Sequence, residues 1–409
     1  MKLALLGADD AMLAIARREL ERGLHEIVLL TEQDVTGQEV ESMARLRTLL
    51  PGRAEIAWET LLYGHPVDAV LVARGPDQEL RADQLRKLVQ AAMPLLISHP
   101  VLDSMLVYYE LDMIRRESGC VMLADTPWRW HPAAAQLAAL IAAGEHSPIG
   151  AIGQAVFERS LSRRDRSAVL VQFARDVDLI RATCGDITKL SALGSPSDEL
   201  TFENLGVQMS GLGSIAVRWS VGPVEASPRG SLTIVGARGK ATLHMPENDA
   251  WRLETRSDGL SETESFQTWD APSAMLEELA AAIEGEPPAV DWNDAARSVE
   301  LAEAIDRSIA KGRTIELHNE DFTDIGTFKG TMTSLGCGLL LAGLCLLLAV
   351  GVVEVVARKA GFAKLAGPLR SWPYWLVGFL VIFLLLQLVI KLAGPGDSGK
   401  READGRSER

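Results

Sequence analysis

The residues whose type and spacing could bind a metal or form disulfide bonds are the cysteines, of which this 409-residue chain has four. Zinc sites and small disulfide-rich domains place their cysteines at characteristic short spacings, and no pair here has the spacing of metal ligands. Two of the four lie inside an apolar run near the C-terminus. We therefore expect no metal site and no disulfide framework, and the pattern suits a reducing compartment. The cysteines are Cys120, Cys184, Cys337 and Cys345.

Charge is distributed unevenly along the chain, and this limits the kinds of partner. The formal net charge is −14; residues 1–325 carry −19, whereas residues 326–409 carry +5. Nucleic-acid binding depends on basic residues that neutralise phosphates, and the acidic part shows no basic patch. We expect no nucleic-acid partner. The composition, 47% hydrophobic and 23% charged, is that of globular protein with room for two or three domains.

Short apolar segments alternate with helical ones over residues 1–124, and these elements would position any ligand-binding side chains. Alternation of this kind is typical of a doubly wound parallel sheet, so we expect an α/β domain there. The expected strands are 2–6, 26–30, 54–58, 67–73, 95–98 and 120–124, and the expected helices are 11–23, 37–50, 81–92 and 101–118.

The pattern changes in the next part of the chain, residues 125–318. Strand-like segments now follow one another closely and are separated by turn residues, which predicts an α+β domain with one open, mostly antiparallel sheet. A polar linker over 319–334 follows. The expected strands are 151–159, 188–194, 205–210, 214–221, 230–235, 240–245 and 251–255, and the closing helices are 272–284 and 293–311.

Two long apolar runs lie near the C-terminus. Residues 335–353 and 372–390 each contain 19 positions without a charge. A helix of about 20 apolar residues spans the hydrocarbon core of a bilayer, and aromatic residues such as Trp372 and Trp375 often mark its edge. We expect two transmembrane helices, 335–357 and 372–392, and a polar tail, 393–409. Two buried core helices are the alternative.

The expected orientation places the globular part in the cytoplasm. With two spans, that part and the tail share one side, which has six flanking basic residues against four in the connecting loop. Loops rich in Lys and Arg favour the cytoplasmic side, so the count leans this way. The N-terminus also lacks the order of regions of a signal peptide, because Asp9 and Asp10 follow a short apolar segment directly.

Four blocks of sequence, at residues 67–73, 129–132, 176–186 and 291–317, occur in a recognisable order and spacing. Together they resemble the glucose–fructose oxidoreductase and inositol dehydrogenase family, Gfo/Idh/MocA, over roughly residues 1–318. The resemblance implies a Rossmann-like first domain that binds NAD or NADP, and a sugar or polyol bound between the domains. Family members often form dimers or tetramers through the open sheet, which leaves a homo-oligomer open here.

The resemblance implies a G-x-G-x-x-G/A turn against the cofactor's pyrophosphate, and only its first glycine, Gly7, is retained. Asp9 stands where the second glycine lets the backbone approach the phosphates. Two like charges repel by about 4 kcal/mol at a separation of about 4 Å and an effective dielectric constant of about 20. Asp9 equally suits a helix cap. Both roles, a cap and a cofactor site of altered form, remain open.

Two further residues are candidates for cofactor binding. Glu32 ends the second expected strand 25 residues after Gly7, which suits an acid that binds a ribose; an ordinary surface acid is the alternative. Arg74 follows the fourth strand, where the family has Thr-Pro. It could bind a phosphate, neutralise Asp9 or lie exposed in a loop. The candidate cofactor-binding residues are thus Gly7, Asp9, Glu32 and Arg74.

The blocks that carry catalysis in the family are also altered. The family's Glu-Lys-Pro segment reads Ser98-His99-Pro100, and its histidine three residues before an aspartate is Arg175, before Asp178. A histidine can exchange a proton near neutral pH, whereas an arginine cannot act as a general base. By this resemblance the candidate catalytic residues are His99, Arg175 and Asp178.

Three altered blocks out of three favour a retained fold with lost or changed hydride chemistry. Our preferred hypothesis is a membrane-anchored, non-catalytic binding or regulatory module, which needs no cofactor and could bind a sugar-like molecule. The alternative is an active NAD(P)-dependent oxidoreductase on a sugar, polyol or related small molecule. In that case His99 would be the acid/base, and Arg175 would hold an anionic group of the substrate.

The two apolar runs generate a first prediction. Removal of residues 334–409 should release a soluble, folded protein, because the remaining chain carries the acidic, globular composition. Detergent-free extraction followed by size-exclusion chromatography measures this. If the shortened protein aggregates while the full chain is soluble without detergent, the runs are core helices instead.

Overall fold

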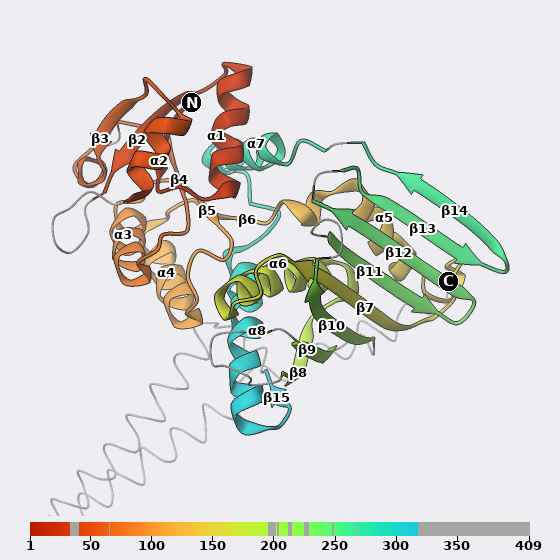
Figure 1. Cartoon of the computed structure of the whole chain (residues 1–409). Helices are drawn as coiled ribbons and strands as arrows, with labels where there is room; N and C mark the ends of the chain where they lie inside the picture. The colour runs from red at the N-terminus through yellow and green to blue at the C-terminus, as the bar shows by residue number, and fades with distance from the viewer. Residues whose placement is uncertain are drawn as a thin grey trace, which may run out of the picture. The chain divides into compact units, whose positions relative to one another are not determined.

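Two β-sheets with helices packed on them make up the described part of the chain (Figure 1). The computed structural model describes residues 1–317 except 33–40, 65, 195–201, 203, 212–214, 225–228, 248 and 268. Both sheets belong to one compact unit, Met1–His318.

The expected linker, both expected spans and the tail lie outside the described residues. Among the helices that are described, none combines the length and the apolar character needed to cross a bilayer.

The first sheet has six parallel strands in the order β3-β2-β1-β4-β5-β6. Every residue of β4 and β5 is buried, as expected where helices cover both faces of a parallel sheet. The expected parallel α/β sheet is therefore confirmed. Its strands are β1 (Lys2–Leu6), β2 (Glu26–Thr31), β3 (Ala54–Ala57), β4 (Ala69–Val72), β5 (Leu95–Ser98) and β6 (Met122–Asp125), and its helices are α1 (Asp10–Arg22), α2 (Glu41–Leu49), α3 (Gln78–Gln90) and α4 (Met105–Ser118).

The strand order of this sheet reverses between β1 and β4. Open parallel sheets bind their ligands beyond the carboxyl ends of the strands at such a reversal. The residues that follow β1, β4, β5 and β6 therefore form the region to examine for a site.

The second sheet has nine strands in the order β14-β13-β12-β11-β7-β10-β9-β8-β15. Only β7 and β10 pair in parallel among its neighbours, so the expected mostly antiparallel sheet is confirmed. The sequence did not reveal β14, because all its residues are exposed and no apolar alternation marks it. The strands are β7 (Ile152–Leu161), β8 (Ile187–Leu193), β9 (Gly206–Gly211), β10 (Ala216–Pro223), β11 (Arg229–Gly236), β12 (Gly239–Pro246), β13 (Arg252–Ser257), β14 (Leu260–Ser265) and β15 (Ile315–Glu316).

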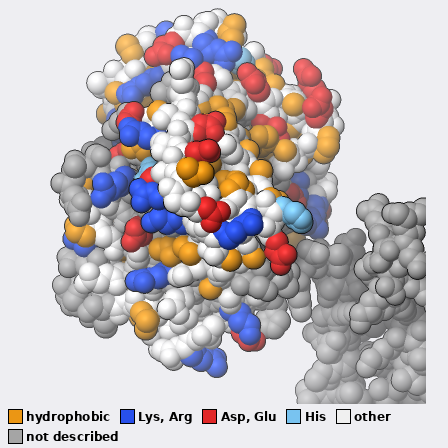
Figure 2. All heavy atoms as spheres, turned by 90° about the vertical axis from the view of Figure 1, so that its right-hand side faces the viewer, with side chains coloured by type: hydrophobic (Ala, Val, Ile, Leu, Met, Phe, Trp, Pro, Cys, Tyr) orange, Lys and Arg blue, Asp and Glu red, His pale blue; other side chains and the backbone are white. Residues whose placement is uncertain are grey.

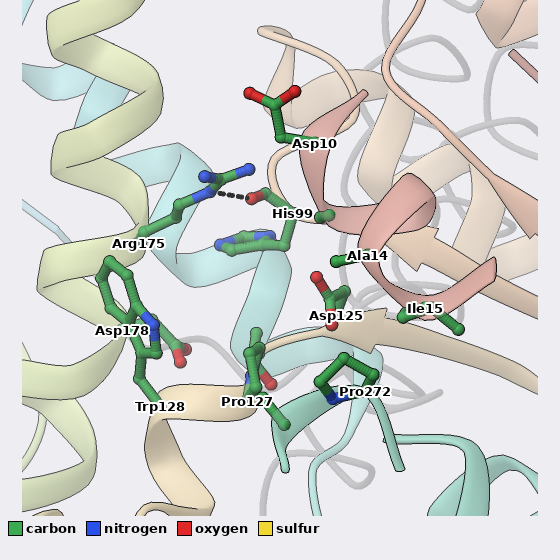
Figure 3. A pocket seen from close by; sticks show the side chains of 13 residues that line it. Asp10, Ala14, Ile15, His99, Asp125, Pro127, Trp128, Arg175, Asp178 and Pro272 are labelled. Atoms are coloured by element: carbon green, nitrogen blue, oxygen red, sulfur yellow. Dashed lines mark hydrogen bonds between the residues drawn. The ribbon is translucent and has the colours of Figure 1, made fainter. Parts of the chain in front are cut away.

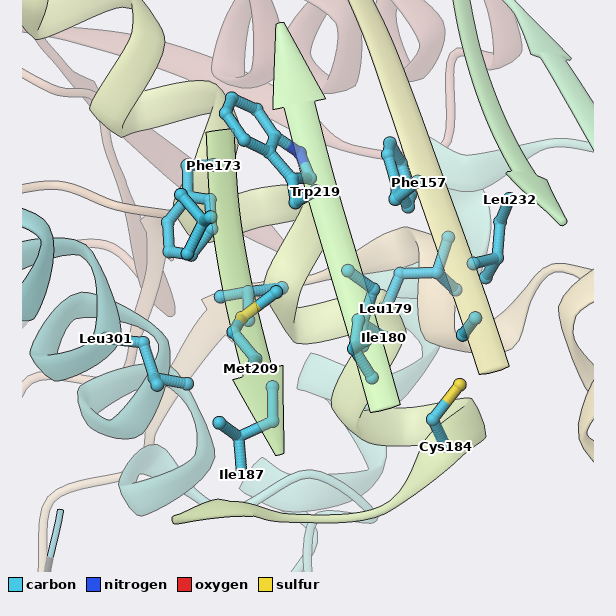
Figure 4. Close-up of a cluster of buried hydrophobic side chains, with 14 of the residues drawn as sticks. Phe157, Phe173, Leu179, Ile180, Cys184, Ile187, Met209, Trp219, Leu232 and Leu301 are labelled. Atoms are coloured by element: carbon cyan, nitrogen blue, oxygen red, sulfur yellow. The ribbon is translucent and has the colours of Figure 1, made fainter. Parts of the chain in front are cut away.

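Three helices share one core with the second sheet: α5 (Pro132–Ala142), α6 (Arg166–Cys184) and α8 (Trp292–Lys311). Figure 4 shows Phe157 and Trp219, from neighbouring strands, pointing toward side chains of α6. Phe173 of α6 meets Trp219 edge to face, with ring centroids 5.1 Å apart. The other elements are α7 (Ala271–Ile283) and the 3₁₀ turns η1 (Trp58–Leu62), η2 (Pro127–Trp130) and η3 (Gly144–His146).

Two helices from the end of the described chain pack back onto the first sheet's helices. Trp292, at the start of α8, stacks on Tyr108 of α4 and donates a hydrogen bond to its carbonyl oxygen. Asp270, which caps α7, pairs with Arg18 of α1 at 2.7 Å. The two sheets are thus held together by aromatic and ionic contacts as well as by the chain connections.

Charges on the outer surface are mixed. On the face drawn in Figure 2, basic and acidic side chains are interspersed, with hydrophobic side chains scattered among them. Neither sign of charge forms a continuous patch on this face.

A buried ion pair inside the second core connects α6 to the sheet. Asp176 of α6 is fully buried and accepts hydrogen bonds from Arg159 of β7, from Gln172 at 2.9 Å and from the indole of Trp219 at 2.9 Å. Both carboxylate oxygens of Asp176 therefore accept hydrogen bonds, which is the condition under which a buried charge is tolerated.

We predict that Asp176→Ala lowers the free energy of unfolding by about 3–5 kcal/mol, because it leaves Arg159 buried without a counter-ion. Asp306→Ala is the matched control. Its ion pair with Arg166 is partly exposed and should be worth about 1 kcal/mol or less. Urea unfolding of both variants measures the difference, and equal losses would contradict the assigned role of Asp176.

Candidate functional site

The turn after β1 starts helix α1 through an aspartate. Gly7 has φ +77°, a conformation that favours glycine, and Asp9 is the N-cap of α1. The Asp9 carboxylate accepts a hydrogen bond of 2.9 Å from the backbone N–H of Met12. The structure therefore confirms the capping role that the sequence left open for Asp9.

The second carboxylate oxygen of Asp9 connects this turn to two other strands. It accepts a hydrogen bond of 2.7 Å from the backbone N–H of Arg74, which follows β4, and one of 2.5 Å from the hydroxyl of Ser98 at the end of β5. One carboxylate thus joins the carboxyl ends of three adjacent strands. It supplies the negative charge that a helix N-terminus attracts.

Glu32, the candidate ribose-binding acid, directly follows β2 and is buried. Its side chain is 2% exposed and pairs with Arg81 of α3, 3% exposed, at 3.0 Å; Gln84 donates a further hydrogen bond of 3.2 Å. The Arg81 guanidinium also lies over Gly7, 2.6 Å from where a Cβ on that glycine would be. Glu32 is therefore enclosed by protein groups.

Sequence reasoning missed Arg81. A basic residue in the first turns of a helix interacts unfavourably with the helix dipole, and this unusual placement of Arg81 could have indicated a buried acidic partner. Asp77 caps α3 only four residues earlier.

The Arg74 side chain turns away from Asp9. Its guanidinium binds both carboxylate oxygens of Asp103 at 2.8 Å and the carbonyl oxygen of Pro100 at 3.3 Å. Only the backbone N–H of Arg74 contacts Asp9. The Arg74 side chain therefore connects the end of β4 to the loop after β5. It forms no ion pair with Asp9.

These residues do not fit a dinucleotide. A pyrophosphate at this turn needs the free N–H groups of the α1 N-terminus and a close approach to the backbone. Asp9 already occupies an N–H group there, Arg81 lies against Gly7, and Glu32 is inaccessible to a ribose. The cofactor cradle, defined here as Gly7, Asp9, Glu32 and Arg81, is filled by the chain's own charges.

A pocket of about 210 Å³ lies beside the cradle, between α1 and α6. Figure 3 shows the ring of His99 between Arg175 and Asp125, with Trp128 and Pro272 lower in the view. The pocket brings together the three candidate catalytic residues, whereas none of the four candidate cofactor residues lines it. Its lining residues are Asp10, Ala11, Ala14, Ile15, His99, Asp125, Thr126, Pro127, Trp128, Arg175, Asp178, Ala271 and Pro272.

His99 follows β5 and is 1% exposed. Burial lowers the pKa of His99 to about 4; nearby Asp178 opposes this shift, and Arg175 and Arg129 reinforce it. Neither ring nitrogen meets normal hydrogen-bond geometry with the described residues, although the backbone of Ala174 favours the protonated ring slightly. His99 is therefore neutral at pH 7, because its pKa lies well below the value of about 6.5 for a free histidine.

Arg175 and Asp178 project from α6 and have different surroundings. The Arg175 Nε donates a hydrogen bond of 2.8 Å to the carbonyl oxygen of His99. Asp178 is 3% exposed and is held by both Nε and Nη2 of Arg129, at 2.8 and 2.7 Å, with Ser298 of α8 at 3.4 Å. Asp178 is thus paired with Arg129 and hydrogen-bonded by Ser298.

Sequence reasoning missed two polar residues that line the pocket, Asp125 and Thr126. Burial raises the pKa of Asp125 to about 7; the nearby charge of Asp9 adds to this, and Arg175 opposes it. The Thr126 hydroxyl is buried without a partner among the described residues. Their position at the carboxyl end of β6, beside the strands already singled out, was the signal for them.

The sequence matches no protein-family description and no curated protein. Solved structures match in fold over most of the chain. An oxidoreductase from Agrobacterium radiobacter, in complex with NAD+, L-tartaric acid and magnesium, has a TM-score of 0.61 and 13% identity, covering 77% of this chain and 98% of that one. Aldose–aldose oxidoreductase from Caulobacter crescentus, complexed with glycerol, has a TM-score of 0.62 and 15% identity, covering 78% and 99%. A myo-inositol dehydrogenase from Corynebacterium glutamicum has a TM-score of 0.59 and 17% identity, covering 78% and 99%. The likeness shows a common fold.

The raised pKa of Asp125 predicts a pH-dependent stability. The folded protein holds this proton up to about pH 7, whereas the unfolded chain releases it near pH 4, so stability falls as pH rises between those values. Asp125→Asn stays neutral, and its stability advantage over the native chain should grow by about 1–2 kcal/mol from acidic to slightly alkaline pH.

Urea unfolding across this pH range measures that difference. Asp10→Asn serves as the control, because the Asp10 side chain lines the same pocket but is 97% exposed. A constant difference between Asp125→Asn and the native chain would refute the assignment.

Proposed function

We propose that this chain is a Gfo/Idh/MocA-type protein that has become a non-catalytic binding or regulatory module and works without a nicotinamide cofactor. The observation that carries the proposal is the filled cofactor cradle. We further propose that the C-terminal hairpin, residues 335–392, anchors the module in a membrane and leaves the globular part in the cytoplasm. The two uncharged 19-residue runs and the flanking basic residues support the anchoring.

The Asp9 network argues against dinucleotide binding on energetic grounds. A pyrophosphate at the α1 N-terminus would have to displace the Met12 contact and would meet the Asp9 charge at close range. Displacement of Asp9 would also release Arg74 and Ser98, which hold the ends of β4 and β5. The cofactor would therefore have to replace three internal hydrogen bonds while repelling their acceptor.

The Glu32–Arg81 pair adds a second obstacle. Both side chains are almost fully buried, and a buried charge left without its partner costs about 3–5 kcal/mol. A ribose could reach Glu32 only after Arg81 had moved off Gly7. Two independent features of the chain thus oppose the same ligand.

The pocket retains groups that bind, but the residues taken as catalytic are poorly suited to proton transfer. Arg175 keeps its proton, Asp178 is paired with Arg129, and His99 titrates near pH 4. The alternative hypothesis, an active NAD(P)-dependent oxidoreductase, would have to use other groups and a cofactor that the cradle does not fit. It is retained as an outcome of the following test.

We predict that the full-length native chain shows no thermal stabilisation by NAD+, NADH, NADP+ or NADPH. A ligand present at 100 times its dissociation constant would stabilise the folded state by about 2.7 kcal/mol, which a thermal-shift titration detects. Micromolar binding of any dinucleotide by the native chain, confirmed by calorimetry, would overturn the proposal and favour the oxidoreductase.

A pair of variants locates the cause. Asp9→Gly should bind dinucleotide better than the native chain, because the like charge is gone, but still weakly, because Arg81 remains over Gly7. Asp10→Gly is the matched control: it removes the neighbouring charge, which is 97% exposed and outside the cradle, and should gain no binding.

A further inference from the structure

We propose that the pocket between α1 and α6 binds a small hydroxycarboxylate, with the carboxylate against Arg175 and a hydroxyl group against His99 and Thr126. The inference rests on the proposed function, because it assigns a ligand class to the pocket that remains beside the filled cradle. It is argued from polar atoms that line the pocket and have no hydrogen-bond partner among the residues that the structure describes.

Arg175 supplies a cation without a counter-ion. Its Nε is used by the His99 carbonyl, but its two terminal nitrogens have no hydrogen-bond or ion-pair partner within the described part of the chain. The carboxylate one turn further along α6, Asp178, is taken by Arg129. A half-buried guanidinium with free N–H groups is suited to bind a carboxylate with two parallel hydrogen bonds.

His99 and Thr126 supply neutral hydrogen-bonding groups. Their side chains are 1% and 5% exposed, and neither His99 nitrogen nor the Thr126 hydroxyl has a well-formed hydrogen bond in the described structure. A buried polar group without a partner costs about 1–3 kcal/mol, so a bound molecule that satisfies these groups would be favoured. Neutral histidine and threonine each offer a donor and an acceptor, and a hydroxyl group complements both.

The remaining wall limits the size and shape of the ligand. Ala14, Ile15, Pro127, Trp128 and Pro272 add apolar surface to the pocket lining. A cavity of about 150 Å³ holds a six-carbon ring, so the 210 Å³ here suits a ligand of roughly eight non-hydrogen atoms. Hydroxy acids of three or four carbons have this size, with one carboxylate at an end.

Asp125 makes the binding dependent on pH. The charged groups around it are Asp9 in the β1–α1 turn, Asp10 on α1, Asp178 and Arg175 on α6, and the titratable neighbour His99 after β5. A bound anion disfavours a second negative charge, so it binds best while Asp125 keeps its proton. Affinity should therefore fall as the pH rises through about 7, and Asp125→Asn should remove that fall.

The test compares ligands that differ in the carboxylate alone. Ligand-observed NMR and calorimetry on the full-length chain measure D-glycerate against glycerol and D-erythronate against erythritol. We expect each acid to bind more tightly than its polyol. Equal binding of acid and polyol, or no binding of either acid at millimolar concentration, would overturn the proposal.

Variants assign the contacts. Arg175→Gln should weaken glycerate binding by about ten- to a hundredfold, the range for a charge-assisted hydrogen bond. Arg166→Gln, on the same helix but paired with Asp306, should leave it unchanged. Thr126→Val removes one hydroxyl from a different element and should weaken binding severalfold even if Arg175→Gln fails to fold. Equal affinity of all these folded variants would refute the assignment.

The two proposals fail separately. Dinucleotide binding by the native chain would overturn the cofactor-free function whatever the acids do. Failure of the acids without dinucleotide binding would remove only the ligand class and would leave the module without a cofactor.

Discussion

The carboxylate of Asp9 is the constraint on which the site depends. It caps α1 and receives hydrogen bonds from the residues that follow β4 and β5. In a parallel sheet those strand ends would otherwise present unpaired N–H groups and a positive helix terminus to solvent or to a bound anion. The Asp9 carboxylate binds two of these N–H groups, those of Met12 and Arg74, and places a negative charge at the helix terminus. The chain therefore has a fold that elsewhere accompanies a cofactor, yet the need for a bound phosphate at this turn is met from within.

The pocket, which is the second part of the site, depends on helix α6 and on helix α8, which shares its core. Ser298 of α8 and Arg129 of η2 fix Asp178, and the buried Asp176 ties the same helix to β7 and β10. Because α6 is held at these points, Arg175 lies at the pocket with terminal nitrogens that bind no other group in the part of the chain that the structure describes. Rigid support of this kind is what a binding site needs, and here it holds a residue whose only hydrogen bond within the described chain is made by its Nε atom. In the cradle, Asp9 and Glu32 both accept hydrogen bonds from protein groups, whereas in the pocket the ring nitrogens of His99 and the hydroxyl of Thr126 have no partner among the described residues.

Much of the fold could be predicted from the sequence, because short continuous apolar runs between turn residues mark buried strands such as β4 and β5. The capping role of Asp9 also followed from its type and place. What could not be predicted was pairing across the fold. Arg81 reaches Glu32 over 49 positions, and Arg74 reaches Asp103 over 29, so no local pattern records either contact. The unusual pKa of Asp125 arises from burial beside Asp9, which only the three-dimensional arrangement establishes. The polar strand β14 was missed because pairing with β13, not burial, defines it.

The buried Glu32–Arg81 pair has a consequence for any redesign of the chain. A substitution of either residue alone leaves the other charge buried and unpaired, at a cost of about 3–5 kcal/mol, which is a large part of the stability of most domains. The two positions must therefore be changed together, as a matched pair, if the protein is to stay folded. The pocket lining includes neither residue, so its side chains can be varied one at a time without this cost.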